Sequence, residues 1–375
     1  YLPEAGGGIT VWLEDVEQVP PNDLLRFSLH LEPDRIPKVH LRVSGLGPLI
    51  TPFARAPLEI EAEDDYQVDS LRLEWTLAAE VETGLEGGAG EVPLPPPEEK
   101  ERAVSAEPAW DVASLAIKPE RRLDLRVGAE DNDALHGAKT GWSGIVSFLV
   151  VTPERLADEF VRREEEQRRV LERLLEKEKE VRDEVFRLVN ESWSKEEPIE
   201  DEVVREMLAI ARIERQHSRQ CEGVADAIRQ IVVEMENNRV SEADDLNRLA
   251  SLIITPLRSL ATESMPAAAE ELRVIRETSE SSARLAQGLA LSERLEAQVD
   301  ALDAIIANMR RLESFTAIVK YLRGIIKTHE EARQATHKSM EAAIESLFEP
   351  DPDDSGEEDG SEETIEDPGR SGPGR

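Results

Sequence analysis

The 375-residue sequence has little of several residue types, and each shortage excludes a class of protein. Its single cysteine excludes an intrachain disulfide framework, and no Cys/His spacing typical of a zinc site is present. Aromatic residues make up only 4% of the chain, and 45 basic residues stand against 80 acidic ones, giving a net charge of −35. Nucleic acid and anionic membrane surfaces both require a basic footprint, so this charge excludes them as partners.

Long apolar runs and common catalytic motifs are also missing. No stretch reaches the ~18–20 apolar residues that a membrane-spanning helix requires. There is no G-x-S-x-G, P-loop or G-x-G-x-x-G motif. The chain starts with Tyr rather than Met, and residues 1–10 lack the basic and apolar regions of a signal peptide. We therefore expect a soluble piece of a longer protein, whose membrane contacts, if any, are made by segments absent from this sequence.

What the sequence does contain changes in character along its length. Residues 1–152 hold 13 of the 21 glycines, whereas residues 153–348 hold 3 glycines and 4 prolines. Residues 349–375 combine 11 acids with 2 bases. These compositions are typical of strands and turns, of helices and of a disordered acidic tail, respectively.

Alternation of apolar and polar residues with a period of two predicts strands in the first part of the chain. The pattern is clearest in two runs, Leu71, Leu73, Trp75 and Leu77, and Leu123, Leu125, Val127 and Ala129. Several short strands separated by turn signals predict a β-sandwich over residues 37–152. The acidic, Pro- and Gly-rich stretch 80–108 is expected to be an exposed loop. Residues 1–36, with strands near 9–14 and 24–31, are expected to end a preceding β module.

Two of these strands end in similar acidic segments. Residues 62–66 read Ala-Glu-Asp-Asp-Tyr, and residues 129–133 read Ala-Glu-Asp-Asn-Asp. With the Leu-x-Leu-x-Trp run that follows the first segment, this pattern resembles bacterial immunoglobulin-like modules over about residues 37–152. It departs from the family pattern at Gln67, where a glycine is common, and in having no disulfide. The resemblance implies an immunoglobulin-like β-sandwich.

The two acidic strand ends also suggest a calcium site. Asp64, Asp65, Asp131, Asn132 and Asp133 offer the hard oxygen ligands that calcium takes, although their spacing is not that of an EF-hand loop. They form one site only if both strands end at the same pole of the sandwich. The alternative, which we favour, is that these side chains accept hydrogen bonds from local backbone N–H groups and hold turns.

A helical region begins at residues 152–154, Thr-Pro-Glu, which supply an N-cap hydroxyl, a proline at the first helical position and an acid in the first turn. Proline positions and a capping signal near residue 241 predict helices at 153–192, 198–236, 241–254, 256–263 and 266–348. In the first of these an apolar seam with 3–4 spacing is interrupted by Glu164, Gln167 and Glu178. The region is expected to be an elongated coiled coil or antiparallel bundle.

The last predicted helix carries two apolar stripes that differ in phase. The first consists of Leu295, Val299, Leu302, Ile306 and Met309, and the second of Leu312, Phe315, Val319, Leu322 and Ile326. Such stripes are buried either by antiparallel packing within the chain or by self-association. The periodicity leaves both open.

Glu214 and His217 form a Glu-x-x-His pair, which is half of the motif of carboxylate-bridged di-iron bundles. The other helical histidines, His329 and His337, have no glutamate three positions before them, so a second pair is missing. We therefore favour a polar patch on a solvated helix face.

Cys221, one turn after His217, has no sign of an oriented base or oxyanion hole and is interpreted as an incidental cysteine.

The order of the parts resembles a class of large, uncharacterised, membrane-anchored bacterial envelope proteins. The likeness is carried by residues 129–132, by Trp-Ser at 142–143 and by residues 150–154 leading into the Arg/Glu-rich helix. It implies a membrane-anchored parent with this part on the extracytoplasmic side, and it implies no catalytic residues.

The sequence thus predicts a non-enzymatic structural or protein-interaction segment of the cell envelope. In this interpretation the sandwich is a spacer, and the helices dock a protein partner or self-associate. One alternative is a cytoplasmic helical scaffold that recruits a partner helix. A metal-dependent helical-bundle enzyme is disfavoured because the second Glu-x-x-His pair is missing.

Overall fold

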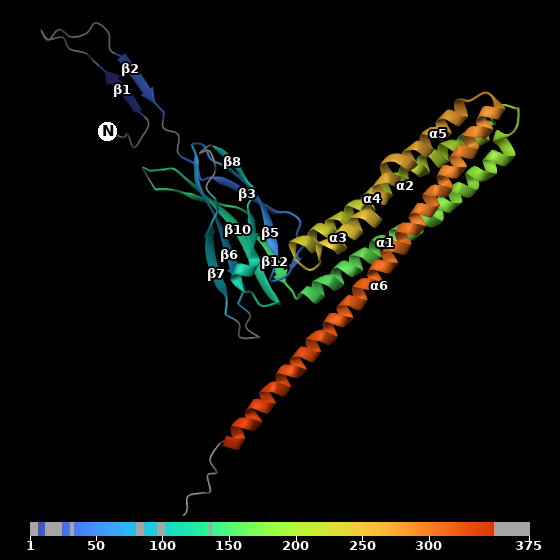
Figure 1. Cartoon of the computed structure of the whole chain (residues 1–375). Helices are drawn as coiled ribbons and strands as arrows, with labels where there is room; N and C mark the ends of the chain where they lie inside the picture. The colour runs from blue at the N-terminus through green and yellow to red at the C-terminus, as the bar shows by residue number, and fades with distance from the viewer. Residues whose placement is uncertain are drawn as a thin grey trace, which may run out of the picture. The chain divides into compact units, whose positions relative to one another are not determined.

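The computed structural model describes the backbone of residues 7–11, 25–30, 34–79, 86–95, 102–134 and 137–348 (Figure 1). Within these ranges the side chains at 25, 29, 312–331, 334–335 and 341–348 are outside the description. The predicted acidic tail, residues 349–375, also lies outside it. The chain divides into two units, Tyr1–Glu313 and Ser314–Arg375. The contacts described below belong to the first.

The protein is a mixed α and β structure in which the strands come first. One sheet has the strand order β4-β12-β10-β6-β7, with β11 also paired to β10, and a second has the order β3-β5-β8, with β9 also paired to β5. The strands are β3 (Lys38–Val43), β4 (Leu49–Ile50), β5 (Arg55–Glu63), β6 (Val68–Leu77), β7 (Gly88–Pro93), β8 (Ala103–Ala106), β9 (Ala109–Asp111), β10 (Arg121–Asp131), β11 (Thr140–Trp142) and β12 (Val146–Val150). All pairs are antiparallel except β4 with β12.

The two sheets share one hydrophobic core. Alternate residues of β5, β6 and β10 are buried in it, among them Leu58, Ile60, Leu71, Leu73, Leu123, Leu125 and Val127. The period-two pattern identified the buried face of β10 in full and of β6 in part, since Trp75 and Leu77 are only partly buried. Near the N-terminus, β1 (Gly7–Val11) and β2 (Leu25–Leu29) pair with each other. Whether they end a preceding module stays a prediction.

The stretch 80–108 is not a loop throughout, contrary to the expectation from its composition. Gly88–Pro93 forms β7 and pairs with β6, and Ala103–Ala106 forms β8 and pairs with β5. The strand signal of β7 is hidden by glycine. Gly90 lies opposite Trp75, and a Cβ at this position would come within 2.6 Å of the indole. The tryptophan ring therefore covers the space that a side chain of β7 would otherwise fill.

The helices follow directly after β12. They are α1 (Pro153–Leu188), α2 (Asp201–Asn237), α3 (Ala243–Leu249), α4 (Thr255–Ser259), α5 (Met265–Glu277) and α6 (Ser281–Phe348). The hydroxyl of Thr152 accepts a hydrogen bond from the Arg155 backbone N–H at 3.3 Å, and Pro153 follows it at the first helical position. Local capping chemistry thus sets the start of α1 where the sequence predicted it.

Two prolines do not begin new helices as expected. Pro256 and Pro266 each come two residues after a π-helical turn, Ala250–Ile254 and Leu260–Ser264, and the backbone stays helical from Ala243 to Glu277. A proline has no N–H to donate and its ring collides with the carbonyl four residues earlier. The wider π turn relieves that collision, so the chain passes each proline without a break.

The real break lies inside the helix predicted for 266–348. Thr278 has extended backbone angles, φ −81° and ψ 119°, and its hydroxyl donates to the Val274 carbonyl at 2.9 Å. Residues 278–280, Thr-Ser-Glu, therefore separate α5 from α6, where the sequence predicts one helix.

The helices pack against one another within the chain. Arg163 at the start of α1 pairs with Glu234 at the end of α2, so the two helices run antiparallel. Arg310 of α6 pairs with Glu172 of α1. The first stripe, Leu295, Val299, Leu302, Ile306 and Met309, is buried in the cores that these helices form. For this stripe the internal alternative is the observed one. The side chains of the second stripe lie outside the described residues.

The β region and the helices meet at the end of α2. Asn238 is fully buried there, its Oδ1 accepts from the Thr51 backbone N–H at 2.8 Å, and its carbonyl accepts from the Thr51 hydroxyl at 2.7 Å. Asn237 donates to the Gly45 carbonyl at 2.8 Å. Gly45 has φ +63°, and a Cβ on it would lie 2.5 Å from Asn237. Glycine is therefore required for the β3–β4 loop to approach α2.

Candidate functional site

Three ionisable side chains lie inside the core of the helical region. Glu178 of α1 and Glu214 of α2 are 0% exposed, and His217 of α2 is 1% exposed. Glu214 and His217 are three residues apart and so share one face of α2, which is turned toward α1. Glu178 occupies a position on the apolar seam of α1, between Leu174 and Val181. Each residue is thus placed by the same helical periodicity that buries its apolar neighbours.

The three side chains converge. His217 Nδ1 lies 2.6 Å from Glu178 Oε2, and one donor atom from each of the three residues lies within 4.8 Å of the others. In their ionised forms, Glu178 Oε1 and both carboxyl oxygens of Glu214 are buried without a hydrogen-bond donor among the described residues, whereas a proton on Glu214 is shared with Glu178. A buried polar atom without a partner costs free energy, so three of them beside one imidazole require an explanation.

Burial controls the protonation of the cluster. Loss of solvent raises the pKa of Glu214 from its ordinary 4.5 to about 9, and the neighbouring Glu178 carboxylate acts in the same direction. Burial also raises the pKa of the Cys221 thiol to about 12, again with Glu178 and Glu214 contributing. Cys221 Sγ lies 3.9 Å from Met265 Sδ. A neutral thiol in this position packs in the core and is not an activated nucleophile.

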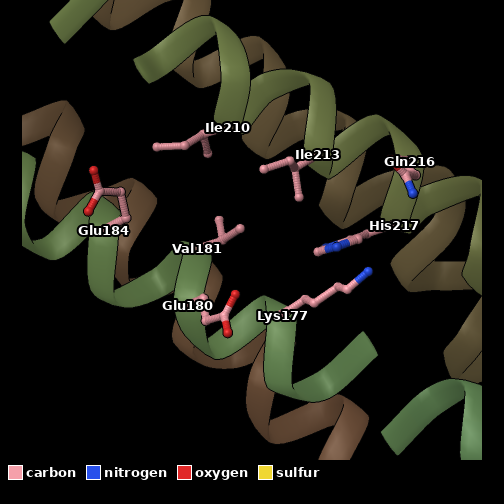
Figure 2. A pocket seen from close by; sticks show the side chains of 8 residues that line it. All are labelled: Lys177, Glu180, Val181, Glu184, Ile210, Ile213, Gln216 and His217. Atoms are coloured by element: carbon pink, nitrogen blue, oxygen red, sulfur yellow. The ribbon is translucent and has the colours of Figure 1, made fainter. Parts of the chain in front are cut away.

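His217 also lines a groove between α1 and α2, which Figure 2 shows from close by. The groove has a volume of about 420 Å³. Its lining comes from α1 (Lys177, Glu180, Val181 and Glu184) and α2 (Ile210, Ile213, Gln216 and His217). Apolar side chains from both helices lie between charged and polar ones. The imidazole is therefore the member of the buried cluster that borders a hollow of the surface.

The sequence-based interpretation of Glu214 and His217 as a solvated polar patch is wrong, because both are buried. It also missed Glu178. The signal was available: a glutamate interrupting the apolar seam of one helix, and a Glu-x-x-His pair on the next. Two carboxylates and an imidazole are the donor set that divalent transition metals accept. One half of a di-iron donor set is present, so the arrangement suits one ion rather than two.

The residues predicted for calcium lie at one end of the β region. Asp131, the last residue of β10, pairs with Val68 at the start of β6. The next residue, Asn132, donates from Nδ2 to Gln67 Oε1 at 3.3 Å. The turn after β5 and the end of β10 are therefore at the same pole, which is the condition that the calcium hypothesis set.

Two of these carboxylates hold turns. Asp64 Oδ2 accepts from the backbone N–H groups of Tyr66 at 2.9 Å and Gln67 at 2.8 Å. Asp131 Oδ1 accepts from the backbone N–H of Lys139 at 2.9 Å. These are the turn-stabilising bonds that the alternative interpretation expects.

An ammonium group already lies at this pole. Lys139 Nζ pairs with Asp34 and lies 3.4 Å from Asp133 Oδ2. Beside it, Asp34, Asp64 and Asp65 have one carboxylate oxygen each within 4.8 Å of the others, and all three are half-buried. Calcium binding here stays a prediction, with turn stabilisation as its alternative.

Comparisons with known proteins add little to this picture. No protein-family model matches the chain, and no curated protein matches it. Among solved structures, the chain is similar to the crystal structure of Spo0M, a sporulation control protein from Bacillus subtilis, with 9% sequence identity and a TM-score of 0.21. The match covers 35% of this chain and 55% of the length of Spo0M. A TM-score this low supports no conclusion about the chain.

The helices were also assessed as membrane spans. In the described part of the chain, none is both long and apolar enough to cross a bilayer.

Proposed function

We propose that this chain is a non-enzymatic structural and protein-interaction segment of a larger cell-envelope protein. An immunoglobulin-like β-sandwich holds an antiparallel helical bundle in a fixed position, and the helices present a docking or self-association surface. The extracytoplasmic placement and the membrane-anchored parent rest on the resemblance of the strand ends and of the strand-to-helix junction. The spacer role rests on contacts within the chain.

The observation that carries the proposal is the buried junction between Thr51 and Asn238. The Oδ1 and the backbone carbonyl of Asn238 both accept hydrogen bonds from Thr51. The Nδ2 of Asn238 donates to the Glu234 carbonyl at 2.9 Å. A flexible connection between domains leaves few contacts across the boundary. Here a buried hydrogen-bond network joins the loop after β4 to the end of α2. A spacer that fixes the orientation of the helices requires such a connection.

Apolar packing supports the same connection. Only Val151 and Thr152 separate β12 from α1. Val151 is fully buried in the helical core, and Leu49 of β4 and Leu149 of β12 pack against that core. At the rim, Arg239 pairs with Asp111 at 2.8 Å. The sandwich and the bundle therefore lose buried apolar area if they separate, which favours one rigid body over two linked ones.

Calorimetry tests the spacer role. We expect the wild-type β region and helices to unfold in one cooperative transition. Asn238→Ala removes a side chain that makes two buried hydrogen bonds, so it should separate the transition into two or broaden it clearly. Asn247→Ala, on the exposed face of α3, is the matched control and should leave the profile unchanged. Two independent transitions in the wild type would contradict the proposal.

The interaction role is tested by the oligomeric state. The second stripe of α6 is defined by the sequence alone, and self-association through it predicts a mass that rises with concentration in light scattering. The double substitution Val319→Asp and Leu322→Asp should abolish that rise without changing the helical content. A concentration-independent monomer that also binds no other envelope protein would contradict the docking role.

A further inference from the structure

We propose that Glu178, Glu214 and His217 bind one divalent transition-metal ion, zinc in the first instance, which ties α1 to α2. The inference does not depend on the structural function proposed above. It stands on the convergence of the three side chains, on the unpartnered oxygens and on the charge that the site has to neutralise.

Geometry is the first step. Ligand atoms around a four-coordinate zinc ion lie roughly 3.3 Å apart, given metal–ligand distances of about 2.0–2.2 Å. The three donor atoms here all lie within 4.8 Å of one another. Glu178 is held by α1, and the other two residues by successive turns of α2. The donor atoms therefore have to move closer together by rotation of side-chain torsions when the ion binds.

Three carboxyl oxygens of Glu178 and Glu214 lack a hydrogen-bond donor among the described residues, and an ion would take the place of those donors. Glu214 is completely buried, and neither of its oxygens receives a hydrogen bond from another donor in the described part of the chain; in the metal-free protein its own proton is shared with Glu178. Glu178 uses one oxygen for His217 and leaves the other without a partner. An ion between these groups would give each of the unpartnered carboxyl groups a ligand bond. Among the carboxyl groups of the described residues with buried unpartnered oxygens, Glu214 is the one in which both oxygens lack a donor.

Charge is the third step. Metal binding displaces the proton of Glu214, and the charge of the two ionised carboxylates is then cancelled by a divalent cation. No arginine or lysine among the described residues forms an ion pair with Glu178 or Glu214. By contrast, the buried Glu234 is held by Arg163 through two bonds of 2.8 and 3.0 Å. The helical core thus compensates one buried glutamate with a guanidinium, whereas Glu178 is paired with the His217 imidazole alone and Glu214 with no arginine or lysine among the described residues.

The donor set selects the kind of ion. Imidazole is a good ligand for zinc, iron and copper, whereas calcium takes 6–8 oxygen ligands. Mixed nitrogen and oxygen donors therefore favour a transition metal over calcium or magnesium. Three protein ligands leave a coordination position for water. The groove beside His217 supplies a route for the ion and the water.

Metal titration of the purified chain tests the proposal. After chelator treatment and dialysis, Zn²⁺ should bind with a stoichiometry of one per chain in calorimetry and should raise the melting temperature by at least 5 °C. Glu214→Gln keeps the shape of the side chain and removes its charge, so the variant should fold while its zinc affinity falls at least 100-fold. Glu222→Gln, on the exposed side of the same helix, should bind zinc like the wild type.

X-ray absorption at the zinc edge gives a readout that needs no variant. The loaded wild type should show a first shell of nitrogen and oxygen with one imidazole. Absence of stoichiometric binding overturns the proposal. So does zinc binding that survives Glu214→Gln, or a first shell that contains sulfur or no imidazole.

Discussion

Acidic side chains have different hydrogen-bond and charge partners at the pole of the β region and in the helical core. At the pole, Asp64 and Asp131 each accept backbone hydrogen bonds through one oxygen. Their other oxygens, Asp64 Oδ1 and Asp131 Oδ2, have no hydrogen-bond partner among the described residues, and the Lys139 ammonium lies 4.0 Å from Asp131 Oδ2.

In the core, Glu178 is paired with the His217 imidazole alone, and neither oxygen of Glu214 receives a hydrogen bond from another donor group among the described residues. Acids at the pole are thus partly satisfied by local backbone donors and a neighbouring ammonium, whereas both oxygens of Glu214 lack a donor. A buried carboxyl group that receives no hydrogen bond at either oxygen is the stronger sign of a binding site.

The largest loss of unfolding free energy should come from removing the arginine that pairs with the buried Glu234. Arg163→Ala leaves Glu234 buried without its guanidinium, and removing one partner of a buried ion pair costs about 3–5 kcal/mol. We expect a loss of about 3 kcal/mol in urea unfolding, because the Arg163 side chain is 26% exposed. Arg169→Ala is the control, since its pair with Glu165 is solvent-exposed and contributes under ~1 kcal/mol. Equal losses would contradict the comparison.

The next effect concerns the pH dependence of the chelator-treated protein. Between pH 4.5 and about 9 the Glu214 carboxyl holds a proton in the folded state and not in the unfolded state. The unfolded state then binds fewer protons, so stability falls as the pH rises. This carboxyl contributes a slope of about −1.4 kcal/mol per pH unit, which amounts to roughly 3 kcal/mol between pH 5 and pH 7.

Urea unfolding at several pH values measures that slope. Glu214→Gln has no proton to lose and should reduce the slope by this amount while making the metal-free protein more stable at pH 8. An unchanged slope in the variant would show that Glu214 ionises normally and is not in the environment described.

A smaller effect is expected at the pole of the β region. Asp131→Ala removes the acceptor of the Lys139 backbone N–H and should cost about 1–2 kcal/mol in unfolding free energy. Asp131→Asn keeps an acceptor oxygen at the same place and should cost less than half as much. If both variants lose the same amount, the carboxylate charge rather than the hydrogen bond is what stabilises this turn.

The smallest effect should be the change in melting temperature on adding calcium. If the strand-end carboxylates serve as turn acceptors, millimolar calcium and EDTA should give melting temperatures within about 1 °C of each other. A clear rise with calcium that disappears in Asp64→Asn would instead support the calcium hypothesis for Asp64, Asp65, Asp131, Asn132 and Asp133. That result would remove the contrast between the pole and the core.

The elements that the sequence predicts well are those governed by local signals. The Thr-Pro-Glu start of α1 and the alternating runs of β6 and β10 depend on neighbours in the chain, and the structure has them at those places. The prediction failed at β7, where the Trp75 ring on the adjacent strand takes the place of a side chain at Gly90. It also failed at Pro256 and Pro266, because π turns absorb prolines that usually mark a helix start.

The candidate site also depends on contacts that local sequence signals do not determine. Periodicity placed Glu178 on the seam of the first helix, and spacing put Glu214 and His217 on one face of another. Which turn of α1 faces which turn of α2 depends on the length of the connection and on core packing over both helices. No local pattern gives that register, so the sequence contained the three ligands without joining them.

Anomalous diffraction at the zinc edge, from crystals of the zinc-loaded chain, tests the central claim most directly. We predict one strong anomalous peak within coordination distance of Glu178, Glu214 and His217. Crystals in which the metal lies elsewhere, or in which these three side chains surround no peak, would contradict it.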